Sequence, residues 1–421
     1  MTMATCARYS APKALVTMEE LRDPSLNLYA DEDDDDWDRV ILSVSHTWES
    51  QQHPDPWGFQ LRSLLQFIQA RIASCAHLKA IAKQLHSHHW VFIDFVCLHQ
   101  YERSEEEQQF FRKAMSSMHL LYAHRYIHRV IRLEELTPES EKSLEGSIDM
   151  YCEATGKFEA RPRSELVLNS TPYSQRGWCV AEVQWMSTQD TVYGCSPMPP
   201  AVFQERVARG EQGLADGLHL KFTHRSDAKL VSQLQEDVFL QHARQREVLT
   251  AHALPQHEVS ILATALPHFV NLERLNILSY GEGFTFGHSI LELACSLERL
   301  RPQKLWHLQV AGDGIGNAGA AALATAAISC KKLSVLAIRS DTIGDAGAEA
   351  LGGAVLECKK LTKFALGGCF MIGDTGIAAL AAASLAAPCI EFAMDGHVSQ
   401  LADGHRWGNR GLDCAFHDGA E

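Results

Sequence analysis

The 421-residue chain lacks an uninterrupted apolar run of the length that a membrane-spanning helix needs, about 18 residues. Residues 1–30 contain no apolar core behind a basic start, so we expect no secretory signal. The twelve cysteines include no Cys-x-x-Cys pair, which favours free thiols in a reducing compartment over a disulfide framework. We therefore expect a cytoplasmic protein that has no membrane partner.

Positive charge is also scarce. Asp and Glu number 52 against 38 Lys and Arg, which gives a formal net charge of −14. Binding to nucleic-acid phosphates needs a basic stripe, so we expect no nucleic-acid partner. The histidines at 86–89 have no further ligands at useful spacing, and we expect no metal site. The acidic run at 31–36 is expected to belong to a solvated, disordered lead-in over residues 1–38.

The first half of the chain alternates strand and helix patterns. Apolar runs of strand length lie at residues 40–45, 90–96 and 129–133. Residues 59–73 predict an amphipathic helix, and Ser104 with Glu107 forms a capping box that starts another. Strands separated by helices predict an α/β domain with a parallel sheet, which we place at residues 39–199. Residues 134–172 are weakly patterned and are expected to form an inserted loop region.

The second half contains an internal repeat with a period of 28 residues. Each copy carries a leucine at the same place: Leu305, Leu333 and Leu361. A glycine-rich turn and an alanine- and leucine-rich helix follow in each copy. Such a unit cannot bury its apolar face alone, so neighbouring units must stack. We expect the repeats at 257–395, after a helical connector at 200–256 and before a disordered tail at 396–421.

One segment of the repeats imitates a dinucleotide-binding fingerprint. Gly314-Ile-Gly-Asn-Ala-Gly319 follows a strand pattern and opens a helix, and Asp341 lies at about the distance of a ribose-binding acid. The equivalent segments 342–347 and 371–376 keep the last two glycines and lack the first. We therefore interpret these glycines as part of the turn geometry of the repeat and expect no bound cofactor.

The repeat pattern, Leu-x-x-Leu-x-Leu followed by a helix, resembles the leucine-rich repeat in its ribonuclease-inhibitor-like form. The resemblance implies a β-α solenoid whose concave strand face binds a protein partner. The strand positions that we expect to be exposed on this face are mixed in chemistry and identify no ligand. They are Trp306, His307, Gln309, Ser334, Ala337, Thr362 and Ala365.

Three blocks of the first half stand in a characteristic order: Ile41-Leu-Ser-Val-Ser-His-Thr-Trp48, Trp90-Val-Phe-Ile-Asp-Phe-Val-Cys-Leu-His-Gln100 and Arg176-Gly-Trp-Cys-Val-Ala-Glu182. Together they resemble the heterokaryon-incompatibility (HET) domain, over about residues 40–187, although Glu49 stands where that family prefers glycine. The last block also resembles the Trp-Cys-x-x-Glu helix of Toll/interleukin-receptor (TIR) domains. The TIR resemblance implies a flavodoxin-like sheet. In the enzymatic TIR domains, the glutamate of this helix catalyses the cleavage of NAD.

On this resemblance, Glu182 is the candidate catalytic residue, NAD is the substrate, and no resident cofactor is needed. A carboxylate beside the bond between ribose and nicotinamide stabilises the oxocarbenium-like transition state. Trp178 lies four residues from Glu182 on the same helix face. Parallel sheets bind ligands at the carboxyl ends of their strands, where His46 and Asp94 lie. The candidate substrate-binding residues are Trp178, Arg176, Asp94, His46 and Trp48.

Structural interpretations of the same residues stay open. Trp178 is also a candidate core tryptophan, Glu182 a cap or a surface partner of Arg176, and Asp94 a residue that holds the following loop. Many TIR domains act only as adaptors. We expect an intracellular recognition or signalling protein whose α/β module cleaves NAD or self-associates. The alternative is a non-catalytic scaffold for protein–protein interaction.

Overall fold

A computed structural model describes residues 39–74, 88–98, 103–123, 127–152, 154–208, 219–222, 225–279 and 284–394. The acidic lead-in, the tail after residue 394 and the side chains of the histidine cluster at 86–89 lie outside these residues. The chain divides into two compact units, residues 1–186 with 205–234 and residues 187–204 with 235–421. The cysteines in the described part are free thiols. Across those same ranges, every helix is too short or too polar to cross a membrane.

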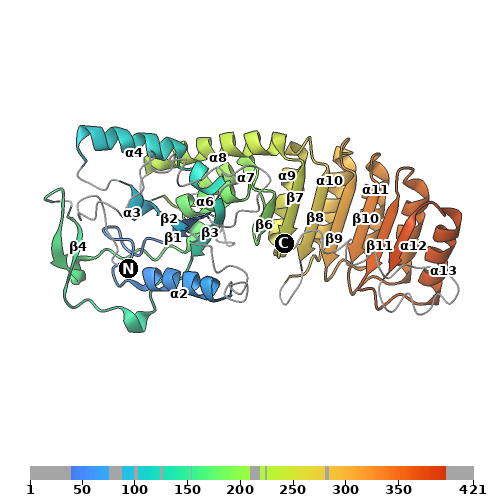
Figure 1. Cartoon of the computed structure of the whole chain (residues 1–421), viewed down its shortest axis with the longest axis horizontal. Coiled ribbons are helices and arrows are strands. Elements are labelled where there is room, and N and C mark those ends of the chain that lie inside the picture. The colour runs from blue at the N-terminus through green and yellow to red at the C-terminus, as the bar shows by residue number, and fades with distance from the viewer. Residues whose placement is uncertain are drawn as a thin grey trace. The chain divides into compact units, whose positions relative to one another are not determined.

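The sheet of the first unit has three parallel strands in the order β2-β1-β3 (Figure 1). They are β1 (Arg39–His46), β2 (His88–Ile93) and β3 (Ile127–Leu133). The helices of this unit are α2 (Phe59–Ser74), α3 (Asp94–Cys97), α4 (Glu105–Ser117), α5 (Leu120–Ala123) and α6 (Gly177–Met186). The predicted parallel arrangement of these strands is confirmed.

The central strand β1 presents two different faces, because successive side chains of a strand point to opposite sides. Leu42 and Val44 pack against Leu64 of α2 in an apolar core. Ser43 donates a hydrogen bond to a carbonyl of α5, and Ser45 donates one to a side chain of α6. One face of β1 is therefore apolar, and the other carries buried hydroxyl groups.

Local signals in the first half are confirmed at the start of α4 and fail in the segment 134–172. The Ser104 side chain accepts a hydrogen bond from the Glu107 amide, and the Glu107 carboxylate accepts one from the Ser104 amide, as a capping box requires. The expected loop region instead contains an antiparallel hairpin of β4 (Ser147–Cys152) and β5 (Lys157–Pro162). Both strands alternate apolar with polar residues, as in Lys157-Phe-Glu-Ala-Arg161, so the strand signal was present in the sequence and was missed.

The second unit is built on a parallel sheet of seven strands, whose order β12-β11-β10-β9-β8-β7-β6 follows the chain. The strands are β6 (Thr191–Tyr193), β7 (Val248–His252), β8 (Arg274–Ser279), β9 (His307–Gly312), β10 (Val335–Arg339), β11 (Lys363–Gly367) and β12 (Glu391–Met394). The strands from β7 onward are linked by α9 (Gln256–Ala265), α10 (Ser289–Leu300), α11 (Gly316–Ser329), α12 (Asp345–Glu357) and α13 (Asp374–Ala386), which stack in chain order (Figure 1). Two more helices, α7 (Pro200–Ala208) and α8 (Arg225–Gln245), contain residues of both units. The sheet thus begins before residue 257 and includes β7 from the segment expected to be a connector.

The 28-residue period appears directly in the strand register. Leu336 pairs with Leu308 on one side and with Phe364 on the other. All three side chains are fully buried in one continuous core, together with the inward faces of the helices. Each repeat therefore contributes the same position to the same layer.

The glycine-rich turns are tied together by one polar side chain from each preceding repeat. Asn317 Oδ1 accepts hydrogen bonds from the amides of Gly344 and Gly347, at 2.8 and 3.1 Å. Asp345, 28 residues later, accepts from Gly373 and Gly376 at 2.7 and 3.0 Å. These four amides are the donors that a phosphate would use at a helix N-terminus, and they are already occupied. The structural interpretation of the glycines is confirmed for these two turns.

Candidate functional sites

Glu182 lies on the buried helix α6, with only 5% of its surface exposed. Ser45 Oγ donates a hydrogen bond to Glu182 Oε2 at 2.5 Å and lies 2.6 Å from the Tyr173 hydroxyl. Burial is the main cause that raises the pKa of Glu182 to about 8, and the nearby negative charge of Asp94 adds to it. At neutral pH the Glu182 carboxyl is therefore mostly protonated, and it is hydrogen-bonded to buried hydroxyl groups.

His46 and Asp94 form a second, adjacent polar pair. His46 Nε2 lies 2.7 Å from Asp94 Oδ1, and His46 Nδ1 lies 3.1 Å from Gln60 Oε1. Burial is the largest single influence and opposes the charged form of both groups, but their mutual attraction and the other hydrogen bonds and charges around the pair together outweigh it. The pKa of His46 is therefore raised and that of Asp94 is lowered. The pair is an ion pair whose carboxylate remains 25% exposed, while the imidazole is buried.

The topology of the sheet explains why these two residues meet. His46 ends β1, and Asp94 directly follows the neighbouring parallel strand β2. The carboxyl ends of adjacent parallel strands share one edge, which is where ligands bind in open α/β sheets. Asp94 also accepts hydrogen bonds from the Phe95 amide, at 2.6 Å, and from the side chain of Trp48. Three of the candidate substrate-binding residues, His46, Trp48 and Asp94, thus come together.

Arg176 donates hydrogen bonds to backbone carbonyls near this edge of the sheet. Its Nε donates to the carbonyl of Thr171 at 2.8 Å, and its two terminal nitrogens donate to the carbonyls of Trp48 and Asn169 at 2.6 and 3.3 Å. The side chain is buried, and burial lowers its pKa. Glu182 bonds to Ser45 and is buried, so the interpretation of Glu182 as a cap or surface partner of Arg176 is wrong.

The two tryptophans among the candidate substrate-binding residues contact other residues of the first unit. Trp178 Nε1 donates to Asp227 Oδ2 at 3.1 Å, and its ring lies edge-on to Trp185 at 6.4 Å between centroids. Trp48 lies edge-on to Phe95 at 5.6 Å. Both indoles are half-buried. Trp178 contacts a different set of residues from Glu182, although both belong to α6.

Sequence reasoning missed the polar residues that complete this cluster. Gln60 bonds to His46 and donates to the carbonyl of Thr47 at 2.5 Å. Glu49 accepts from both the amide and the hydroxyl of Thr137, at 3.1 and 2.8 Å. Burial raises the pKa of Glu49 despite these bonds. The available signal was the alternation of serines with apolar residues in β1, which predicts that one buried face needs polar partners.

On the second unit, the candidate partner-binding residues separate into two groups. Trp306, Ser334 and Thr362 form one row immediately before β9, β10 and β11, and His307 is half-buried beside them. Gln309, Ala337 and Ala365 occupy paired positions within the strands and are buried, Gln309 with only 5% of its surface exposed. The expectation that these last three are exposed is wrong. Ala337 and Ala365 pack with Ala393 in a small buried cluster along the strands.

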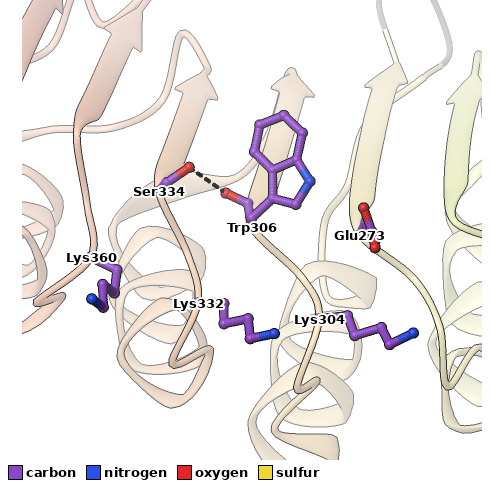
Figure 2. A pocket seen from close by; sticks show the side chains of 6 residues that line it. All are labelled: Glu273, Lys304, Trp306, Lys332, Ser334 and Lys360. Carbon is purple, nitrogen blue, oxygen red and sulfur yellow. Dashed lines mark hydrogen bonds between the residues drawn. The ribbon is translucent and has the colours of Figure 1, made fainter.

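An open groove of about 490 Å³ is lined by Trp306 and the half-buried Ser334 of this row, which is called the exposed row below. Figure 2 shows the Trp306 ring above it, with Lys304 and Lys332 extending in the same direction below the ring. The lining residues are Glu273, Lys304, Trp306, Lys332, Ser334 and Lys360. An exposed indole and three lysines on one open surface suit a macromolecule that carries apolar and negatively charged groups.

In the described part of the chain, no group of three or more His, Cys, Asp or Glu side chains is arranged to hold a metal ion. Comparison of the sequence with known protein families finds no matching family model. Neither curated proteins nor solved structures yield a significant match to the chain. Functional inference for this mixed α/β protein therefore depends on its own motifs and geometry.

Proposed function

We propose that this chain is a recognition protein in which β-α repeats of the leucine-rich type bind a protein partner and an HET/TIR-like α/β module provides the output. The observation that carries the proposal is the row of Trp306, Ser334 and Thr362. It recurs at the repeat period, its members are exposed or half-buried, and two of them, Trp306 and Ser334, line an open groove.

The repeat half supports this function through its construction. A leucine-rich solenoid has helices on one side of its strands and an accessible surface on the other. Here the apolar strand positions Leu308, Leu336 and Phe364 pack with the helices. The alternate positions Gln309, Ala337 and Ala365 are buried, so the surface offered to a partner is the row of residues that precedes the strands. The Asn317–Asp345 ladder replaces the asparagine or cysteine ladder usual in such repeats.

The α/β module supports the HET/TIR-like assignment through three features. Its strand order β2-β1-β3 is the start of a flavodoxin-like order. Its three sequence blocks converge on one edge of the sheet, through His46, Asp94 and Arg176. Self-association of this module is one output that such domains have, and it needs no catalytic group.

A second candidate output is glycosidic cleavage of NAD at Glu182. The observation that favours it is a carboxyl group with a pKa of about 8, which is suited to proton transfer near neutral pH, beside the His46–Asp94 pair. With 5% of its surface exposed, Glu182 has to become accessible before it can reach a substrate. Incubating the protein with NAD, beside a Glu182→Gln variant, tests this output. Nicotinamide release by the wild type alone supports it, and no release even when the protein is clustered removes it.

The partner-binding function is tested by photo-crosslinking from a residue of the exposed row. Thr362 is the suitable site, and Thr325, which is exposed on α11, is the reference site. A protein captured from the first site and not from the second supports the proposal.

A further inference from the structure

Three lysines of the groove repeat with the same 28-residue period as the strands. They are Lys304, Lys332 and Lys360, each two residues before a member of the exposed row. All three side chains are exposed, and none forms an ion pair with any residue within the described ranges. In a chain of formal charge −14, this is a local line of cations that no described acid neutralises.

The spacing of this line is fixed by the backbone. The carbonyl of Trp306 accepts a hydrogen bond from the amide of Ser334, and the carbonyl of Ser334 accepts one from Thr362, both at 2.8 Å. Neighbouring strands lie about 4.8 Å apart, so the three lysine backbones are separated by steps of about 5 Å and span about 10 Å. The backbone positions of the lysines therefore have a regular pitch; the Lys304 and Lys332 side chains point in one direction and that of Lys360 in the other (Figure 2).

The groove also contains an aromatic residue, and its two ends carry opposite charges. The side chain of Trp306 is exposed, and the guanidinium of Arg274 lies 5.8 Å from the centre of its ring. Glu273 closes the end of the groove on the β8 side, and Lys360 marks the β11 side. A partner that places acids over all three lysines must avoid Glu273. The same partner can cover the indole with an apolar side chain.

We infer that the groove binds an acidic helix of a protein partner, with carboxylates toward the lysines and one apolar side chain on Trp306. On a helix, residues three or four apart lie about 5–6 Å from each other, which matches the lysine pitch. Alternate residues of an extended chain lie about 6.6–6.8 Å apart and match it less well. This inference rests on the proposed partner-binding function and specifies the chemistry of the partner.

The test measures binding of a labelled helical peptide by fluorescence anisotropy, with the full chain as receptor. The peptide carries glutamates at i, i+4 and i+7 and a leucine beside them, and its control has glutamines at the three positions. We compare a Lys332→Gln/Lys360→Gln receptor with a Lys331→Gln/Lys359→Gln receptor. The second pair changes the same charge at adjacent exposed lysines outside the groove lining.

The glutamate peptide is expected to bind, and the Lys332→Gln/Lys360→Gln variant to weaken it about fivefold, as two partly exposed ion pairs would. The Lys331→Gln/Lys359→Gln variant should change it less than about twofold, and Glu273→Gln should strengthen it. Equal weakening by both lysine variants, or equal binding of the glutamine peptide, overturns the inference. Competition by inorganic tripolyphosphate together with no effect of Trp306→Ala identifies a plain anion site and also overturns it.

This result is separable from the partner-binding function itself. A partner crosslinked from Thr362 while the acidic peptide fails to bind removes the inference and leaves the proposed function standing. If neither the crosslink nor the peptide binding is seen, the proposed function fails with it.

Discussion

Ser45 Oγ lies 2.5 Å from Glu182 Oε2 and 2.6 Å from the Tyr173 hydroxyl. Glu182, the candidate catalytic residue, is therefore part of a buried chain of hydrogen bonds. The chain links the central strand β1 to helix α6. In this arrangement Glu182 is part of the packing between sheet and helix, and any chemistry at it requires the chain to open.

The buried carboxyl makes stability depend on pH. Between about pH 4.5 and 8 the unfolded chain ionises Glu182 while the folded protein keeps it protonated, so stability falls as the pH rises. A Glu182→Gln variant lacks this loss. The difference between its free energy of unfolding and that of the wild type should therefore shift in favour of the variant by about 3 kcal/mol between pH 4.5 and pH 7. Denaturant unfolding at several pH values measures it. The raised pKa of His46 also lowers stability as the pH rises, in both proteins; the contribution differs between them only by the part that the charge of Glu182 adds to the His46 pKa, which is smaller than the part from Asp94. If the free energies of unfolding of the two proteins change in parallel with pH, the raised pKa of Glu182 is contradicted.

Asp94 holds the imidazole of His46 in its charged form. Burial alone would lower the pKa of His46, and the carboxylate at 2.7 Å reverses the direction. Asp94→Asn should therefore drop the pKa of His46 below its ordinary value of 6.5. An NMR titration measures this, with the His46→Gln spectrum used to assign the signal. A titration midpoint that stays in place in Asp94→Asn would show that another group controls it.

Two glycines of α12 differ in the space around them, so replacing them with alanine should have opposite effects on stability. A Cβ on Gly347 would lie 2.9 Å from both Asn317 Oδ1 and Ile343 Cγ2, whereas a Cβ on Gly353 meets nothing within 4 Å. Gly347→Ala should destabilise the protein by about 1–3 kcal/mol. Gly353→Ala, in the same helix, should stabilise it by up to about 1 kcal/mol because alanine has the higher helix propensity. Equal effects of the two substitutions in a denaturation assay would refute the packing argument.

The hydrogen bonds that Asn317 and Asp345 accept across the turns should survive replacement of Asp345 by asparagine and be lost on replacement by alanine. Asp345→Ala removes the acceptor for the Gly373 and Gly376 amides and should cost about 1 kcal/mol. Asp345→Asn should cost much less, because Asn317 occupies the equivalent position one repeat earlier with the same bonds. Thermal unfolding of the two variants side by side measures the difference. If they are equally destabilised, the ladder depends on charge and not on hydrogen bonding.

Several features of the fold were predictable because they depend on periodicity or on local capping. The 28-residue recurrence of leucines predicted the strand register of Leu308, Leu336 and Phe364, and Ser104 with Glu107 predicted the start of α4. The β4–β5 hairpin was not predicted although each of its strands alternates apolar and polar residues, because both runs are only six residues long and lie in a segment without a regular succession of strands and helices.

The candidate site was predictable in part. His46 and Asp94 follow adjacent strands, so their meeting follows from the parallel topology. The burial of the Glu182 side chain could not be predicted from the sequence, because α6 is buried on almost every side and has no amphipathic pattern that would show which way Glu182 points. The burial of Gln309 likewise depends on its neighbours in the sheet, which lie in other repeats.

The most direct test of the partner-binding account is photo-crosslinking in the native host cells, with a photoreactive residue at Thr362 or at Thr325. The account predicts a specific protein adduct from Thr362 that disappears in a Trp306→Ala background, and none from Thr325. The same adducts from both positions, or an adduct from Thr362 that is indifferent to Trp306, would contradict it.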